Sequence, residues 1–144
     1  MKSGAWTPLI AAVNVRTMST TEATSTLGKA FAEALATKDF DALRGLLHEQ
    51  IDFRGLTPRR YWEASTPDEV IQGVLRQWFE DSDHIDELVH LETGSFADRQ
   101  RVGYRFRGHN PDGEFVVEQQ AYLEERDGKI GWMRAICSGF RPLR

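Results

Sequence analysis

The C-terminal half of this chain alternates apolar and polar residues, a pattern typical of strands that bury one face. The alternating stretches are residues 84–93, 100–107, 114–124 and 130–140. The turns between them are rich in Gly, Asp, Asn and Pro. The last turn contains Asp127 and Gly128, a pair that favours the left-handed conformations of a tight hairpin. We therefore predict four strands in an antiparallel meander.

The closing of the last hairpin decides which side chains share a face. If residues 126–128 form a three-residue loop, Gln119 faces the same side as Cys137, and Glu118 faces the opposite side. A two-residue turn would slip the pairing by one residue and exchange the faces of one strand. We prefer the three-residue loop because it gives one cleanly apolar inner face. That face contains Ile85, Val89, Leu91, Val102, Tyr104, Phe106, Phe115, Val117, Gln119, Ala121, Leu123, Met133, Ala135 and Cys137.

The neighbouring hairpin and the outer face of the sheet add two expectations. Pairing Phe106 with Phe115 would place Arg107 opposite Glu114, a favourable cross-strand match. The outer face carries apolar residues among charged ones, namely Val116, Tyr122, Trp132 and Ile136. Because apolar side chains on a polar sheet face are typical of a covered surface, we predict a homodimer through this face.

Helices are expected before these strands. An apolar stripe at spacings of three and four begins after Thr26 and predicts the first helix. Asp39 is placed to cap a second, shorter helix. Thr66, Pro67 and Glu69 give a third helix a capped start, with Pro67 in its first turn. The sequence therefore predicts three helices.

Helices that precede a run of strands indicate an α+β fold, with the helices on one face of the sheet. Between the second and third helices we predict a short strand at residues 51–54. A Gly- and Pro-containing loop follows it at residues 55–65.

Composition excludes some classes of function. The 144 residues carry a formal net charge of −4, which argues against nucleic-acid binding. Cys137 is the only cysteine, which favours a reducing cytoplasm, and no apolar run approaches the roughly 20 residues of a membrane span. We expect residues 1–23 to be a disordered extension, with Met1 and Met18 both open as the true start, and residues 24–144 to form one domain.

Two stretches carry a family resemblance. They are FAEALATKDFDALRGLLHEQIDF at residues 31–53 and the closing hairpin RDGKIGWMRAICSGF at residues 126–140. Over residues 24–142 the chain resembles the NTF2-like superfamily, and within it the SnoaL-like branch of small bacterial proteins. The resemblance implies three N-terminal helices packed on a curved antiparallel sheet, forming a cone with an internal pocket. The superfamily includes isomerases, dehydratases, cyclases, epoxide hydrolases and non-catalytic binders, so the fold does not decide the function.

The catalytic patterns of the superfamily do not match this chain. Where a ketosteroid isomerase has a tyrosine, an aspartate base and an acid, this sequence has Phe31, Arg54, and Ala121 or its neighbour Gln119. Phe31 and Ala121 supply neither the base nor the acidic donor that proton abstraction next to a carbonyl requires. The Asp-Arg-Asp relay of limonene-epoxide-hydrolase-like enzymes and the His/Asp/Tyr set of the scytalone-dehydratase-like branch are missing too. The sequence therefore predicts no recognisable catalytic set.

The predicted ligand-binding residues are Phe31, Arg54, Trp62, Trp78, Tyr104, Gln119 and Cys137. Several also have a plainer structural interpretation. Tyr104 and Gln119 are polar groups of the inner face and would equally fit a hydrogen-bonded pair in the core. Arg54 fits either the mouth of the pocket or a surface ion pair. Trp78 fits a core position by its helical spacing, and Cys137 fits an inert buried thiol.

A group of histidines and acidic residues suggests a metal site at first sight. Its members are His84, Asp86, His90 and Glu92 on one predicted strand. At about 3.3 Å per residue, His84 and His90 lie roughly 20 Å apart, which is too far for one ion. We predict no metal site and no cofactor.

Three functions remain open. The leading hypothesis is a dimer that binds a small, mostly apolar molecule in the cone. The alternative is an isomerase, cyclase or hydrolase acting on a polyketide- or terpenoid-like substrate, with Glu118, Tyr104 or Arg54 handling protons. An inward-facing Glu118 would favour the enzyme, since a desolvated carboxylate has the raised pKa of a general base. The third function is a protein-interaction adaptor that uses the outer sheet face.

Overall fold

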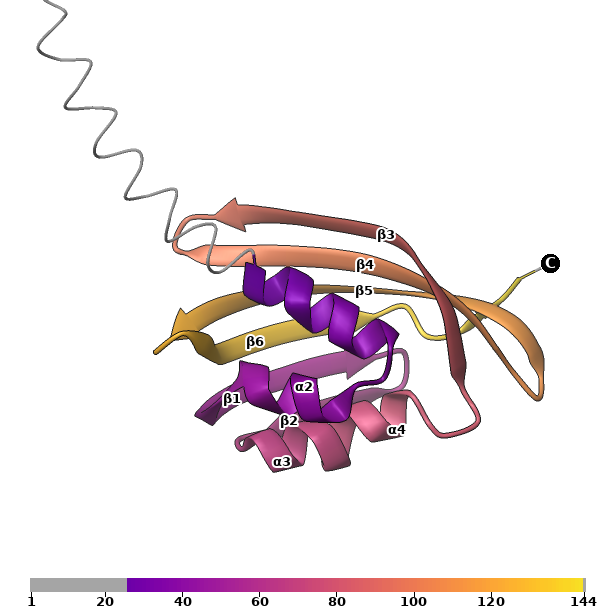
Figure 1. Cartoon of the computed structure of the whole chain (residues 1–144), viewed down its shortest axis with the longest axis horizontal. Coiled ribbons are helices and arrows are strands. Elements are labelled where there is room, and N and C mark those ends of the chain that lie inside the picture. The colour runs from indigo at the N-terminus through magenta and orange to yellow at the C-terminus, as the bar shows by residue number, and fades with distance from the viewer. Residues whose placement is uncertain (1–25, 144) are drawn as a thin grey trace, which may run out of the picture.

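The computed structural model describes residues 26–143, in which helices cover one face of a curved sheet (Figure 1). The helical elements are the N-terminal helix (residues 26–36), α2 (Phe40–Leu46), and a third helix composed of α3 (Pro67–Val70), the π-helical segment η1 (Ile71–Leu75) and α4 (Arg76–Trp78). The strands are β1 (Leu47–Thr57), β2 (Arg60–Ala64), β3 (His84–Phe96), β4 (Arg99–Asn110), β5 (Gly113–Arg126), β6 (Lys129–Cys137) and β7 (Arg141–Pro142). The predicted extension over residues 1–23 lies outside the described residues.

The sheet is mixed, and the predicted all-antiparallel sheet is wrong on this point. Its strand order is β2-β1-β6-β5-β4-β3, and the short β7 pairs with β5. β1 and β6 are parallel, whereas the other pairs along this order are antiparallel. The third helix and several strands separate β1 from β6 in sequence, so no local pattern signals their pairing. The α+β architecture itself, with helices on one face of a curved sheet, is confirmed.

Capping residues define the helix starts as the sequence predicts. The Asp39 side chain accepts a hydrogen bond of 3.1 Å from the Ala42 N–H at the start of α2. At α3, Thr66 Oγ1 accepts a hydrogen bond of 3.1 Å from the Glu69 N–H. Glu69 reaches back to the N–H and hydroxyl of Ser65, one residue before the cap itself.

The segment between α2 and α3 contains more strand than predicted. β1 is longer than the expected strand at residues 51–54, and the expected loop contains β2, which forms a hairpin with β1. The loop prediction rested on Gly55 and Pro58. Pro58 does lie in the turn between the strands, but Gly55 is a buried residue inside β1.

The β5–β6 hairpin closes differently from the prediction but keeps the predicted faces. Its turn consists of Asp127 and Gly128 alone, which have positive φ angles of 54° and 81°. A bulge beyond the turn inserts one extra residue on β6. The bulge compensates the slip that a two-residue turn causes, so Gln119 pairs with Cys137 on the inner face and Glu118 faces outward.

The predicted pairing of β4 with β5 is wrong by two residues. Phe106 pairs with Val117, two positions beyond the expected partner, and the Arg107–Glu114 match does not form. The Asn110 side chain closes a turn shorter than the one predicted. Because the shift is an even number of residues, both faces of the hairpin stay as predicted.

β3 departs from simple alternation. Its pairing with β4 is irregular between Ile85 and Glu87 and again between Leu88 and His90. Leu88 packs against the core, whereas Val89 is 45% exposed. The prediction that Val89 belongs to the inner face is therefore wrong, because bulges break the two-residue period.

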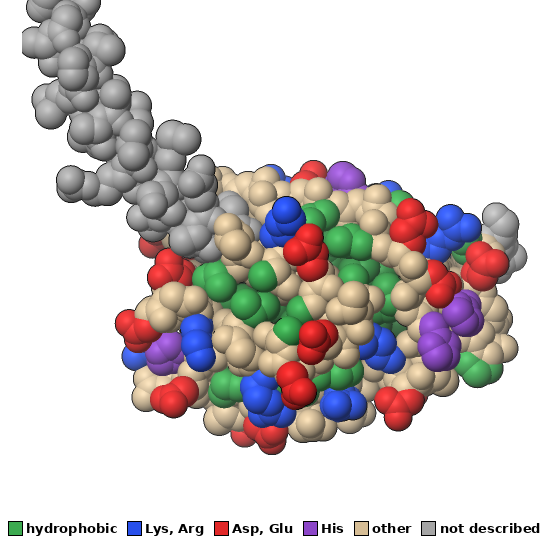
Figure 2. Space-filling view, viewed as in Figure 1, with side chains coloured by type: hydrophobic (Ala, Val, Ile, Leu, Met, Phe, Trp, Pro, Cys, Tyr) green, Lys and Arg blue, Asp and Glu red, His purple; other side chains and the backbone are tan. Residues whose placement is uncertain are grey.

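Aromatic side chains pack between the helices and the inner face. The most fully buried of them are Phe31, Phe53, Phe79, Tyr104 and Phe106, each at most 1% exposed. The rings of Phe79 and Phe106 meet edge to face, with centroids 5.9 Å apart. On the helical side of the molecule, acidic and basic side chains are interspersed, with apolar side chains visible between them (Figure 2).

Candidate functional site

Three predicted site residues lie side by side on the inner face of the sheet. Tyr104 on β4, Gln119 on β5 and Cys137 on β6 are direct cross-strand partners. Tyr104 and Gln119 are each 1% exposed, and Cys137 is 7% exposed. The Tyr104 hydroxyl donates a hydrogen bond of 2.6 Å to Gln119 Oε1. This bond agrees with the core-pair interpretation of the two residues.

Gln119 nevertheless leaves one buried donor unused. Its Nε2 group is buried and has no hydrogen-bond partner among residues 26–143. The neighbouring Cys137 Sγ accepts a hydrogen bond of 3.4 Å from the Gly139 N–H. An unpaired buried polar group costs on the order of 1–3 kcal/mol, so most such groups in native proteins have a partner. The core pair therefore explains the hydrogen bonding of the Tyr104 hydroxyl and of Gln119 Oε1, but it leaves Gln119 Nε2 unexplained.

A row of small residues runs beside this polar row. Gly55 on β1, Ala135 on β6 and Ala121 on β5 are cross-strand partners. Trp78 of α4 lies over Gly55, since a Cβ at this glycine would be only 2.9 Å from Trp78 Cη2. The indole Nε1 of Trp78 is a second buried donor that has no partner in the part of the chain that the structure describes.

Trp62 and Phe31 pack against the same region. The Trp62 N–H donates a hydrogen bond of 3.0 Å to Thr57 Oγ1, and its ring meets Trp78 edge to face at 6.1 Å. The Phe31 ring, from the N-terminal helix, lies 6.4 Å from the Tyr104 ring. We call the group formed by Phe31, Trp62, Trp78, Tyr104, Gln119 and Cys137 the inner site.

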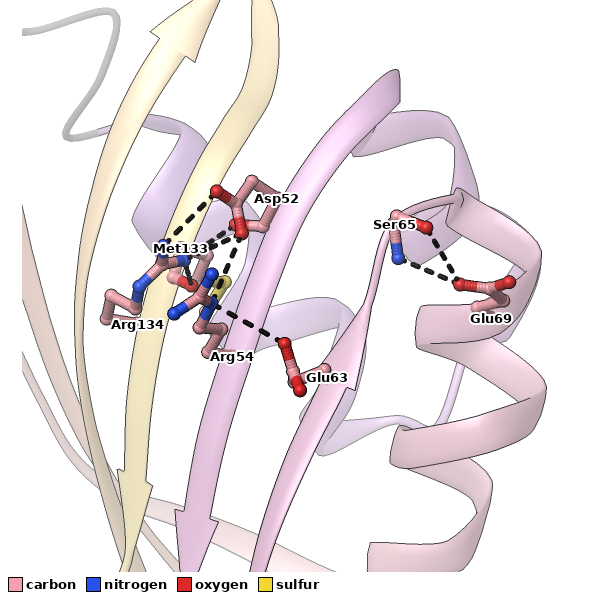
Figure 3. Close-up of polar contacts among 7 residues, drawn as sticks. All are labelled: Asp52, Arg54, Glu63, Ser65, Glu69, Met133 and Arg134. Carbon is pink, nitrogen blue, oxygen red and sulfur yellow. Dashed lines mark hydrogen bonds and ion pairs between the residues drawn. The ribbon is translucent and has the colours of Figure 1, made fainter.

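Arg54 lies on the opposite face, so the expectation that it reaches the pocket is wrong. Its Nε is 3.7 Å from the Asp52 carboxylate and 3.8 Å from that of Glu63, and Arg134 also binds Asp52 at 3.2 Å (Figure 3). Successive side chains of a strand point to opposite faces, and the flanking Gly55 is buried. The alternative interpretation, a surface ion pair, describes Arg54 correctly.

Two further groups considered as proton handlers lack the properties of a general base. Glu118 faces outward and binds Arg105 at 2.8 Å, and this hydrogen bond lowers the pKa of the Glu118 carboxyl. Burial raises the pKa of the Tyr104 phenol above its usual range, and Cys137 adds to the effect. At neutral pH the first group is an ionised surface carboxylate and the second a protonated phenol. The inward Glu118 that would favour an enzyme is therefore not observed.

A cavity of about 430 Å³ lies on the outer face of the sheet. One wall consists of Arg54, Arg134, Tyr122 and Arg101, and the other of Tyr61, Leu56, Ile136 and Gln120. Four of these residues are large, apolar and exposed: Leu56 48%, Tyr61 48%, Tyr122 42% and Ile136 56%. We call this cavity the outer groove. Sequence reasoning found two of the four, but missed Leu56 and Tyr61 because their segment was assigned to a loop.

The histidines and acidic residues of β3 do not assemble a metal site. The His109 Nδ1 lies 2.8 Å from Asp86 Oδ2, its ring stacks on that of His84 at 4.9 Å, and His90 pairs with Glu92 at 3.5 Å. Within residues 26–143, no group of three or more His, Cys, Asp or Glu side chains is placed to hold a metal ion. Over the same range, no helix has the length and apolar character needed to cross a membrane.

Comparison with known proteins gives matches in structure only. No family model and no curated protein matches the sequence. An NTF2-like protein from Burkholderia thailandensis matches with a TM-score of 0.61 and 16% identity, over 80% of this chain and 90% of that one. The fold is NTF2-like. A protein of ketosteroid isomerase-like fold from Catenulispora acidiphila, solved with trimethylamine, has a TM-score of 0.58 and 17% identity, over 80% and 87% of the two chains. An LEH-like epoxide hydrolase from M. tuberculosis has a TM-score of 0.60 and 14% identity, over 81% and 84%.

Proposed function

We propose that this protein binds a small, mostly apolar molecule in the inner site, between the helices and the sheet. The observation that carries the proposal is the buried amide of Gln119, whose Nε2 has no partner within the described residues. An oxygen of a bound molecule would satisfy this donor. The rings of Phe31 and Trp78 would then contact its apolar part, as expected for a site with few polar groups and many aromatic ones.

An enzyme with the same fold is less well supported. The hypothesis of catalysis on a polyketide- or terpenoid-like substrate is supported by similarity of fold to known proteins. One of these proteins is an epoxide hydrolase. The fold alone does not carry a reaction to this chain. Its candidate proton handlers fit poorly, since Glu118 and Arg54 face outward and the Tyr104 phenol stays protonated. Binding therefore accounts for the inner site better than turnover does.

Native mass spectrometry of the protein purified gently from its own host tests the proposal. We expect an added mass of a few hundred daltons, the size of a ligand that such sites bind. Gln119→Leu should stay folded and lose most of this added mass, whereas Gln120→Leu, exposed on the outer face, should keep it. A wild-type protein without added mass, or equal retention in both variants, would count against the inner site.

We also propose that the outer groove is covered by a second copy of the chain. The support is a continuous apolar row across adjacent strands, formed by Tyr61, Leu56 and Ile136, with Tyr122 on the facing wall. Exposed apolar groups gathered on one sheet face are typical of interfaces between protein chains. A different protein partner, as in the adaptor hypothesis, would use the same groups and leave the wild-type chain monomeric.

A further inference from the structure

The two walls of the outer groove are adjacent cross-strand rows of different character. The row that crosses β1, β6, β5 and β4 is mainly basic and consists of Arg54, Arg134, Tyr122 and Arg101. The row that crosses β2, β1, β6 and β5 is mainly apolar and consists of Tyr61, Leu56, Ile136 and Gln120. Outward residues of one strand are two positions apart, so the rows run about 7 Å from each other. The cavity between them is therefore amphipathic.

The charges on the walls of the outer groove have one sign. Three of the described residues that line the groove are arginines, and none of them is acidic. The carboxylates that contact these arginines belong to Asp52, Glu63 and Glu92, which do not line the groove. A negatively charged group inside the groove would face guanidinium groups without a competing carboxylate.

Arg101 is the least neutralised of the three arginines. Its Nη1 lies 3.6 Å from Glu92 Oε1, too far for a hydrogen bond, and its guanidinium makes no hydrogen bond with residues 26–143. Arg134, in contrast, donates hydrogen bonds to the backbone carbonyl and the carboxylate of Asp52 (Figure 3). On the adjacent strand Arg101 lies over Gly94, because a Cβ there would be 2.8 Å from Arg101 Nη2. Its donors are therefore available to a carboxylate, which a guanidinium binds through two parallel hydrogen bonds.

We infer that the outer groove binds an elongated apolar carboxylate, with the carboxylate on Arg101 and the apolar chain along Ile136 and Leu56. The cavity of about 430 Å³ is within the size range of small-molecule sites. Three strand spacings separate β4, which carries Arg101, from β1, which carries Leu56. This distance of about 14 Å suits an extended chain better than a compact molecule.

This inference goes beyond the proposed inner site and adds a second ligand. It also adds a control on assembly, because the second copy proposed for the outer groove would cover the same apolar row. A molecule that binds only the uncovered groove shifts the equilibrium towards the monomer by mass action. The carboxylate and the second copy therefore compete.

Probes that share one carbon chain and differ in charge test the inference. Calorimetry at neutral pH compares decanoate, decan-1-ol and decylamine. The formal net charge of the chain is −4, so overall attraction favours the ammonium, and a preference for decanoate must come from local arginines. We expect the wild-type protein to bind decanoate about tenfold more tightly than decan-1-ol, and decylamine most weakly.

Two arginines of β4 give a matched pair of variants. Arg101→Gln should abolish the preference for decanoate over decan-1-ol and leave the affinity for decan-1-ol unchanged. Arg107→Gln removes an arginine that pairs with Glu87 outside the outer groove, and it should keep the preference. Ile136→Asp, on the apolar wall, should weaken the binding of decanoate and decan-1-ol together.

The outcomes separate this inference from the two earlier proposals. Equal wild-type affinities for decanoate and decan-1-ol, no binding of either, or equal effects of Arg101→Gln and Arg107→Gln would overturn it. Decanoate binding that is lost in Gln119→Leu but kept in Arg101→Gln would also overturn it and would support the inner site. In sedimentation, decanoate should dissociate the wild-type dimer. A dimer that stays intact while decanoate binding depends on Arg101 would support the carboxylate site and contradict the second copy.

Discussion

Gln119 uses one end of its side-chain amide in a hydrogen bond with Tyr104 and keeps the other end unpaired within the described residues. Gln119 accepts from the Tyr104 hydroxyl through Oε1, which ties β4 to β5 inside the core, and presents Nε2 unpaired. The Tyr104 phenol stays protonated and donates its only proton to this bond. At the scale of residues, the Gln119 amide therefore combines a structural hydrogen bond with the donor on which the proposed binding rests.

A double-mutant cycle measures the structural task. Tyr104→Phe leaves Gln119 Oε1 without its donor, and Gln119→Leu leaves the Tyr104 hydroxyl without its acceptor. We expect each change to lower the free energy of unfolding by about 1–3 kcal/mol. The double variant leaves neither group unpaired, so its loss should fall short of the sum by about 1 kcal/mol. Urea unfolding gives the four values, and strictly additive losses would contradict the coupling.

The environment of Glu118 should make the stability of the protein depend on pH. The hydrogen bond from Arg105 lowers the pKa of Glu118 in the folded state, below the unfolded value of about 4.3. A lowered folded pKa stabilises the protein above the unfolded value, and this contribution is lost as the pH falls through the folded pKa. We expect Glu118→Gln to lower the urea midpoint at pH 7, because the ion pair with Arg105 is lost. The decrease should be small, because the pair is partly exposed.

The difference between Glu118→Gln and the wild type should shrink as the pH falls from about 4.3 towards 3. Glu49→Gln, a change of an exposed glutamate on β1, is the matched control and should show no comparable trend. A difference in midpoint that stays constant down to pH 3 would exclude a stabilising role for the ionised Glu118.

At the scale of elements, the contact of α4 with β1 depends on one missing side chain. A Cβ at Gly55 would come 2.9 Å from Trp78 Cη2, closer than packed atoms tolerate. We expect Gly55→Ala to lower the free energy of unfolding by about 1–3 kcal/mol, because the indole must move. Gly45→Ala in α2, where a Cβ would meet nothing within 4 Å, should raise it by about 0.5–1 kcal/mol.

Chemical denaturation of the two glycine variants makes this comparison, since both changes add one methyl group. Equal effects would show that the change in the unfolded chain dominates and that the contact with Trp78 is loose.

Elements with a local signal were predictable, and the others were not. The caps at Asp39 and Thr66 work through side chains within three residues, so they appear in the sequence and again in the structure. The faces of β5 and β6 were predicted correctly although the turn was not, because a bulge offsets the two-residue turn at Asp127 and Gly128. β2 was not predicted, because Gly55 and Pro58 are residue types that commonly indicate a loop.

At the scale of the whole molecule, the two faces of the sheet differ in what covers them. The helices and aromatic rings cover the inner face, while the outer groove stays open in one chain. Exposure of Ile136 and its neighbours to water is unfavourable, at roughly 25 cal/mol per Å² of apolar surface, and this favours association.

Sedimentation equilibrium at micromolar concentration should therefore find a dimer in the wild type. Ile136→Asp places a charge in the outer groove and should give a monomer that keeps its fold. Val89→Asp changes another exposed apolar residue, on β3 and outside the outer groove, and should remain dimeric. A monomeric wild type, or dissociation by both variants, would contradict the proposed interface.

The sequence by itself determined the class of fold, the helix caps and most of the inner face, because these depend on periodicity and on side chains near in sequence. It also grouped Tyr104, Gln119 and Cys137 correctly, since alternation along β4, β5 and β6 preserves their face. Only the tertiary structure decided that β1 pairs parallel with β6, which sets Arg54 outside and brings Trp78 over Gly55. It alone showed that two buried donors have no partner among residues 26–143, because hydrogen-bond partners depend on contacts between segments far apart in sequence.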